Sequence, residues 1–230
     1  MVARGDLGIE TSLTDLPNIQ RNIMFACAKW GKRSIVATHL LESMINNPTP
    51  TRAEVTDIAN AIYDGADGLL VTGETAVGKY PLKVIEILQN VIKDNENVNL
   101  FYGNYLPEEV TKTAEGISHA VSQVSKNLKV SAIVTMTHSG GTARMISRHR
   151  PKSPIIALTP FKNIARQMSI LWGVNAIVVG KYKDIDEIPA LCRKVLDEKK
   201  LIKDGELFIF TGGVPMNVAG TTNYLSIQKK

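Results

Sequence analysis

Two short apolar stretches, SIVAT at residues 34–38 and GLLVT at residues 68–72, decide the fold class of this chain. Both are almost wholly apolar, which is typical of strands buried on both faces of a parallel sheet. The pattern Thr51-Arg52-Ala53-Glu54 lies between them and predicts a capped helix start, with the helix reaching about Tyr63. A strand, a helix and a second strand in this order predict an α/β fold with a parallel sheet.

The same alternation extends in both directions along the first 95 residues. Helical spacing of apolar residues predicts helices over 15–30 and 81–93. The opening stretch MVARGDLGIE (1–10) is interpreted as the end of a strand followed by a charged, glycine-flanked turn. Buried parallel strands need neighbours on both sides, so two strands and part of a third are too few. Residues 1–95 are therefore predicted to be a slice of a larger barrel or sheet.

The second part of the chain, residues 107–230, reads as a separate α/β domain. A linker rich in asparagine is expected at 96–106, followed by a helix over about 108–127. Beyond it the sequence predicts four apolar strands, a final edge strand and the helices between them, which together make a mostly parallel, doubly wound five-stranded sheet. The expected strands are 132–135, 155–158, 176–179, 207–211 and 222–227, and the expected helices are 142–149, 161–171 and 185–199.

Composition excludes several classes of protein. Apolar residues make up 44% of the 230 residues, and no apolar run approaches the ~18 residues that a membrane span needs. No signal peptide pattern is present, and two distant cysteines, Cys27 and Cys192, favour reduced thiols and a cytoplasmic location. The net charge of +5 divides into −2 for residues 1–95 and +7 for residues 96–230. Without an aromatic-rich basic stripe, this favours a small phosphorylated ligand over nucleic acid or a membrane.

Three strand ends in the first part carry candidate catalytic and binding residues. Gly5 would let a backbone approach an anion closely, and Asp6 offers a hard oxygen suited to Mg²⁺. Thr38 ends a strand, where barrel active sites lie, and its hydroxyl is a candidate substrate ligand and catalytic group. Glu74 follows the next strand as a candidate catalytic residue that relays protons or orients a neighbour. The alternatives stay open: a plain turn, a capping threonine, and a carboxylate that satisfies helix-start amides.

A fourth stretch, VTMTHSGGTA (134–143), predicts a phosphate site in the second domain. A strand leads through a loop rich in hydroxyls and glycines into a helix start, where backbone N–H groups attract anions. Residues 144–166 contain no acidic residue, although they hold several lysines and arginines. The alternative is a solvated basic helix face with hydroxyls that only cap the helix. The candidate phosphate ligands are Thr137, Ser139, Gly140, Gly141 and Thr142.

Taken together, these stretches resemble pyruvate kinase. MVARGDLGIE, ATHLLESM followed by PTPTRAEVTDIANAIYDGADG, and TGETAVGKYP are similar to consecutive active-site segments of that family. THSGGTARMISRHRPKSPIIALTP resembles the phosphate loop of its effector domain, and FTGGVPMNVAGTTNYL resembles the ending of bacterial members. The resemblance implies that residues 1–95 are the C-terminal part of a (β/α)₈ TIM barrel and that 107–230 are the C-terminal effector domain.

The resemblance also implies an activity and its site. The family transfers a phosphoryl group from phosphoenolpyruvate to ADP, giving pyruvate and ATP in glycolysis, and uses Mg²⁺ or Mn²⁺ together with K⁺. By resemblance Asp6 is one metal carboxylate, while Gly5, Asp6 and Thr38 hold the substrate's carboxylate end. The catalytic lysine, the second metal carboxylate and most K⁺ ligands correspond to sequence before Met1, so this chain alone is not expected to be active.

Further expectations concern effector and partners. A homotetramer is expected, because the family is commonly tetrameric. The effector is expected to be a phosphorylated small molecule, and a sugar or nucleotide monophosphate fits at least as well as fructose 1,6-bisphosphate. The alternative function, from a different class, is a non-catalytic module that binds a phosphate effector.

Overall fold

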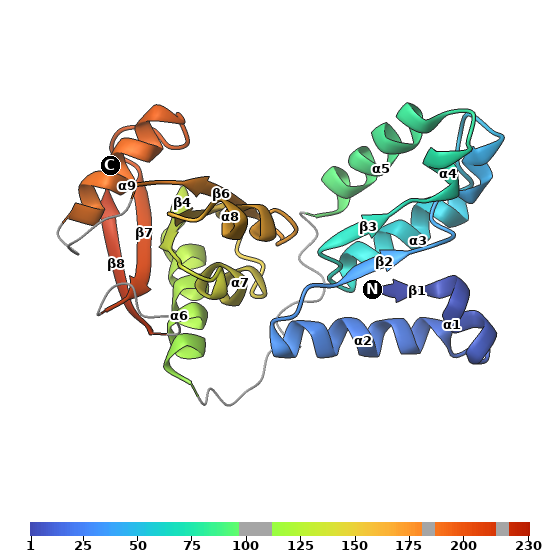
Figure 1. Cartoon of the computed structure of the whole chain (residues 1–230), viewed down its shortest axis with the longest axis horizontal. Helices are drawn as coiled ribbons and strands as arrows, with labels where there is room; N and C mark the ends of the chain where they lie inside the picture. The colour runs from blue at the N-terminus through green and yellow to red at the C-terminus, as the bar shows by residue number, and fades with distance from the viewer. Residues whose placement is uncertain (97–111, 181–186, 215–220) are drawn as a thin grey trace. The chain divides into compact units, whose positions relative to one another are not determined.

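A computed structural model describes residues 1–96, 112–180, 187–214 and 221–230 of the chain. The chain divides into two compact units, unit 1 (residues 1–106) and unit 2 (residues 107–230), each with its own sheet (Figure 1). Of the expected linker 96–106, residues 97–106 lie outside the described residues. The start of the helix expected over 108–127 lies outside them as well, for residues 108–111.

Unit 1 alternates short parallel strands with helices. Its described strands are ordered β1-β2-β3, and Val36 at the centre lies opposite Val2 and Leu69. The helices that follow the three strands pack their apolar sides onto one buried cluster, to which α2 contributes Met24 and α3 contributes Ile58. The elements are β1 (Val2–Ala3), α1 (Arg4–Glu10), α2 (Leu16–Trp30), β2 (Ile35–Ala37), η1 (Glu42–Ile45), α3 (Arg52–Tyr63), β3 (Gly68–Leu70), α4 (Gly73–Ala76) and α5 (Pro81–Asn95).

Local sequence signals explain where the long helices of unit 1 begin and end. The side chain of Thr51 accepts a hydrogen bond from the backbone of Glu54, and the Glu54 carboxylate accepts one from the backbone of Thr51. This reciprocal capping box confirms the predicted start of α3. Helix α2 has a proline in its first turn and ends at Gly31, whose φ of 59° is the left-handed conformation typical of a helix end.

The prediction of a turn at residues 4–8 is wrong, because Arg4–Glu10 forms helix α1. Glycine disfavours helix formation, and Gly5 and Gly8 lie within this short segment. Contacts outside the helix compensate: the backbone N–H of Gly5 donates to the Thr38 hydroxyl (2.9 Å). The other end is closed by Thr11, whose backbone N–H donates to the carbonyl of Leu7 (2.9 Å).

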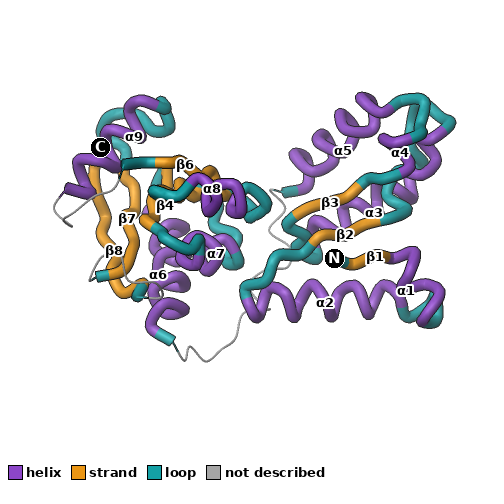
Figure 2. The backbone as a smooth tube through the Cα atoms, viewed as in Figure 1, coloured by secondary structure: helices purple, strands orange, loops and turns teal. Residues whose placement is uncertain are grey.

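Unit 2 is built on a five-stranded sheet, as expected, with order β6-β5-β4-β7-β8. All neighbours are parallel except β7 and β8, so the final edge strand is antiparallel. The chain begins in the middle at β4, builds outward to β6, and then returns to place β7 on the other side of β4 (Figure 2). The elements are α6 (Thr113–Leu128), β4 (Ala132–Met136), α7 (Gly141–Ser147), β5 (Ile155–Thr159), α8 (Lys162–Met168), β6 (Val174–Val178), α9 (Ile188–Glu198), β7 (Leu207–Gly213) and β8 (Thr222–Lys229).

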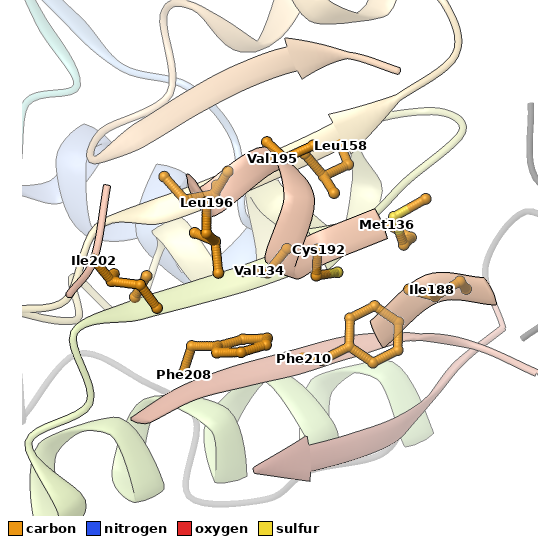
Figure 3. Packing of buried hydrophobic residues seen from close by; sticks show 12 residues of the cluster. Val134, Met136, Leu158, Ile188, Cys192, Val195, Leu196, Ile202, Phe208 and Phe210 are labelled. Carbon is orange, nitrogen blue, oxygen red and sulfur yellow. The ribbon is translucent and has the colours of Figure 1, made fainter. Parts of the chain in front are cut away.

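Helices cover both faces of this sheet, which makes it doubly wound. On one face α9 packs against Val134 and Phe208, in the cluster that Figure 3 shows. On the other face Ile133 and Ile209 pack against α6 and α7, because alternate residues of a strand point to opposite sides. The reversal of winding lies between β4 and β7. In open α/β sheets such a reversal marks the place where ligands bind, outside the carboxyl ends of the strands.

Among the described residues, no helix is both long enough and apolar enough to cross a membrane.

Candidate functional site

The candidate residues of unit 1 follow the carboxyl ends of its three strands. Gly5 and Asp6 come after β1 in the first turns of α1, Thr38 comes directly after β2, and Glu74 comes after β3 in α4. Because the strands are parallel and adjacent, these three segments meet at one edge of the sheet.

The structure brings Gly5 and Thr38 together. The Gly5 N–H donates to Thr38 Oγ1 at 2.9 Å, and the same hydroxyl donates to the carbonyl of Ala37 at 2.6 Å. Asp6, the next residue, is exposed in the first turn of α1. A backbone N–H, a hydroxyl and an exposed carboxylate are thus gathered within two short segments, and these groups suit an anion together with a hard cation.

Glu74 is buried, with only 3% of its surface exposed. Its carboxylate accepts hydrogen bonds from the backbone N–H of Thr72 (2.8 Å) and of Leu41 (3.2 Å). The carboxylate therefore joins the end of β3 to the loop after β2. The bond to Thr72 is the contact of a carboxylate that satisfies a helix-start amide, whereas the bond to Leu41 reaches the loop that carries Thr38.

A second carboxylate, that of Glu54, holds the far end of the same loop. Besides capping α3, it accepts hydrogen bonds from the backbone N–H of Ser43 (2.8 Å) and from the Ser43 hydroxyl. Burial opposes ionisation, but the hydrogen bonds from Ser43 and Thr51 outweigh it and lower the pKa of Glu54 below its usual value. Glu54 is thus an ionised anchor for the segment that follows Thr38.

The structure adds two residues that sequence reasoning missed, Arg4 and Asp57. The Arg4 side chain is 9% exposed and forms an ion pair with Asp57 of α3. It also donates to the carbonyls of Thr38 and His39. The sequence signal for Arg4 is an arginine directly after an apolar strand. This signal does not identify Asp57, 53 residues away, as its partner.

The metal prediction rests on Asp6. In the part of the chain that the structure describes, no group of three or more His, Cys, Asp or Glu side chains lies together as a metal site. An exposed carboxylate at a helix start fits one ligand of a Mg²⁺ or Mn²⁺ ion, which needs only one or two protein carboxylates when substrate and water complete its shell. No K⁺ ligand is predicted from the sequence among the described residues.

In unit 2 the predicted phosphate loop lies between β4 and α7, beside the reversal of winding. Thr137 is 5% exposed, and its hydroxyl accepts a hydrogen bond from the Gly140 N–H (3.0 Å). The Thr142 hydroxyl shares a hydrogen bond with the hydroxyl of Thr222 on β8 (2.7 Å). Ser139 is exposed, and α7 begins at Gly141 without a side-chain cap. Two of the three hydroxyls of this loop are thus engaged in hydrogen bonds within unit 2, and the Ser139 side chain is exposed.

The basic residues after the loop are not all directed to solvent. The Arg150 guanidinium lies over the Trp172 ring, 5.0 Å from its centroid. Burial lowers the pKa of Arg148, and the nearby Glu115 charge partly offsets this. Part of the positive charge in residues 144–166 therefore serves packing within unit 2.

Gly140→Ala should destabilise unit 2 by about 2–3 kcal/mol. Gly140 has φ +77°, and an added Cβ would lie 3.1 Å from Cγ of the fully buried Met168. Gly173→Ala is the matched control, since its φ is +66° but nothing lies within 4 Å, and it should cost only about 1 kcal/mol. Urea unfolding in a Trp30→Phe background, followed by Trp172 fluorescence, measures both losses of stability, and equal losses would contradict the steric argument.

Two family models match this chain: the pyruvate kinase barrel domain over residues 1–85 and the pyruvate kinase alpha/beta domain over residues 115–228. The chain belongs to the pyruvate kinase family. Pyruvate kinase of Thermotoga maritima is 43% identical over 229 residues, which cover 100% of this chain and 49% of that protein. Pyruvate kinase of Clostridium acetobutylicum is 40% identical over 232 residues, which cover 99% and 49%.

A solved structure agrees. The crystal structure of a pyruvate kinase from Cryptosporidium parvum superposes with a TM-score of 0.87 at 31% identity, over 99% of this chain and 46% of that one. The chain spans about half the length of the curated relatives named above. The predicted family and fold class are confirmed: the end of a pyruvate kinase barrel and an α/β domain with a mostly parallel sheet.

Proposed function

We propose that unit 1 supplies one side of a pyruvate kinase active site, in which a phosphoryl group passes from phosphoenolpyruvate to ADP. The observation that carries this proposal is the contact between the Gly5 N–H and the Thr38 hydroxyl, beside the exposed carboxylate of Asp6. In this proposal Gly5, Asp6 and Thr38 hold the carboxylate end of the substrate. Asp6 also binds the divalent metal.

The chemistry assigned to these residues is positioning and charge neutralisation, on which phosphoryl transfer depends. A bound divalent ion would neutralise negative charge on the phosphoryl group. The Thr38 hydroxyl donates to the Ala37 carbonyl, and a rotation about the Cβ–Oγ1 bond would redirect its proton to a substrate oxygen while Oγ1 keeps its contact with the Gly5 N–H. Thr38 and Glu74 are the proposed catalytic residues, with Glu74 fixing the loop that carries Thr38.

For unit 2 we propose an effector site for a phosphorylated small molecule, formed by Thr137, Ser139, Gly140, Gly141 and Thr142. Its support is the place of this loop at the switch point of a doubly wound sheet. Because Thr137 and Thr142 already hydrogen-bond within the protein, Ser139 and the backbone N–H groups at the start of α7 carry most of the recognition. The same location favours the second candidate function, a phosphate-binding module without catalysis.

Membership of the family supports the remaining proposals. We propose that residues 1–95 are the end of the barrel, 96–106 a linker and 107–230 the effector domain. K⁺ is the proposed second cofactor. A cytoplasmic homotetramer without nucleic-acid or membrane partners is the proposed context, and the two cysteines, both free thiols, are consistent with a reducing compartment.

Asp6→Asn should weaken Mn²⁺ binding to this chain at least tenfold, since it removes the anionic oxygen that a hard cation prefers. In the ¹⁵N-labelled wild type, Mn²⁺ should broaden the amide signals of Gly5, Asp6 and the neighbouring Thr38 more than those of distant residues. Asp15→Asn is the control, because Asp15 is an exposed carboxylate of the same unit at the start of the next helix.

Broadening that survives Asp6→Asn, or that is absent from the wild type at millimolar Mn²⁺, would count against the metal assignment. A coupled assay for pyruvate, carried out on the full-length protein, separates the two candidate functions. A pyruvate kinase forms pyruvate and should lose most of its turnover on Asp6→Asn. A phosphate-binding module without catalysis forms no pyruvate.

A further inference from the structure

Two consecutive residues of unit 1, Thr38 and His39, have a backbone conformation that non-glycine residues rarely adopt. Their φ angles are 69° and 53°, both in the left-handed region. For a β-branched residue such as threonine this is an outlier, and it persists only where the surroundings enforce it. The strain lies at the residue whose hydroxyl meets the Gly5 N–H.

The guanidinium of Arg4 contacts the backbone of this left-handed pair. Its Nε and Nη2 donate to the Thr38 carbonyl at 3.2 and 2.7 Å, and Nη2 also donates to the His39 carbonyl at 3.1 Å. The two carbonyls of the left-handed pair therefore converge on one planar donor. A guanidinium suits this task because its donors are fixed in a rigid fork, which lysine lacks.

The remaining donor, Nη1, binds the carboxylate of Asp57 on α3. The Arg4 side chain is only 9% exposed, and a buried charge needs a partner. Asp57 supplies the opposite charge and fixes the orientation of the fork. The other two anchors act further along the loop, with Glu74 at Leu41 and Glu54 at Ser43.

We propose that Arg4 and Asp57 form a clamp that imposes the left-handed conformation of Thr38 and His39 and so holds the Thr38 hydroxyl against the Gly5 N–H. Both are positioning residues for the substrate-carboxylate site. The role of the clamp in substrate binding rests on the proposed function. The effect of Arg4 and Asp57 on the backbone of Thr38 and His39 concerns unit 1 alone and can be tested without substrate.

The test compares Arg4→Lys with Arg21→Lys in the ¹⁵N-labelled chain. Arg21 pairs with Asp64 in the same unit, but its side chain is 54% exposed, so it is the matched control. A strong intraresidue NOE between the amide proton and Hα marks a positive φ. Arg4→Lys should weaken this NOE at Thr38 and His39 and accelerate hydrogen exchange of the Gly5 amide at least tenfold. Arg21→Lys should change neither.

Asp57→Asn is a second variant that tests the same clamp, and it remains informative if Arg4→Lys fails to fold. It should reproduce the change at Thr38, His39 and Gly5, and Asp57→Glu should restore part of the wild-type signals. Unchanged NOEs and exchange in both Arg4→Lys and Asp57→Asn would overturn the clamp. Failure of Mn²⁺ to broaden the wild-type amides would instead overturn the proposed function, so the two failures are distinct.

Discussion

Phe208→Ala should lower the free energy of unfolding of unit 2 by about 3–5 kcal/mol. Phe208 is fully buried on β7, next to β4 in the sheet, and packs in the cluster that α9 closes (Figure 3). Removal of the ring takes away apolar contacts and leaves a cavity between the sheet and the helix. The surrounding strands are hydrogen-bonded on both sides and cannot collapse fully into it.

Urea unfolding of the chain in a Trp30→Phe background gives the measurement. Trp30 lies in unit 1, so the remaining Trp172 reports on unit 2 alone. Leu128→Ala is the control, because Leu128 is 46% exposed at the end of α6 and should cost under about 1 kcal/mol. A loss for Phe208→Ala no larger than that of the control would contradict the assignment of Phe208 to the core.

Much of the fold could be predicted because its signals are local. The capping box at Thr51 and Glu54 lies within four residues, and the helix begins where the pattern places it. The strand Ile155–Thr159 is fully buried, as its unbroken apolar run indicates. Family resemblance added the barrel, which two strands and part of a third do not specify by themselves.

What could not be predicted depends on contacts between distant residues. Residues 4–8 were expected to be a charged, glycine-flanked turn, but they lie in helix α1, and the bond from Gly5 to Thr38 reaches across 33 residues. The Arg4–Asp57 pair spans 53 residues. His149 lies in a run of basic residues that suggested a solvated face or a phosphate site, and its ring contact with His119 of α6 and its partial burial do not follow from that pattern.

The environment of His149 disfavours its charged form. Burial, followed by the charges of Arg148 and His119, lowers the pKa of His149 from 6.5 to about 3. The rings of His119 and His149 meet edge to face at 5.5 Å. His149 Nε2 is buried and has no hydrogen-bond partner among the described residues. The folded unit therefore keeps this imidazole neutral across the physiological range.

Unit 2 should accordingly lose stability as the pH falls from about 6.5 towards 3. In that window the unfolded chain binds a proton at His149 while the folded chain does not, so acid favours unfolding. One pKa unit corresponds to 1.36 kcal/mol, so the loss at pH 5 relative to pH 7.5 amounts to about 2 kcal/mol.

His149→Phe keeps an aromatic ring of similar size without a titratable nitrogen, and it should remove this share of the pH dependence. Urea unfolding at pH 5 and 7.5 in the Trp30→Phe background, followed by Trp172 fluorescence, measures the difference for unit 2. The same pH dependence in His149→Phe as in the wild type would show that other groups carry the acid sensitivity.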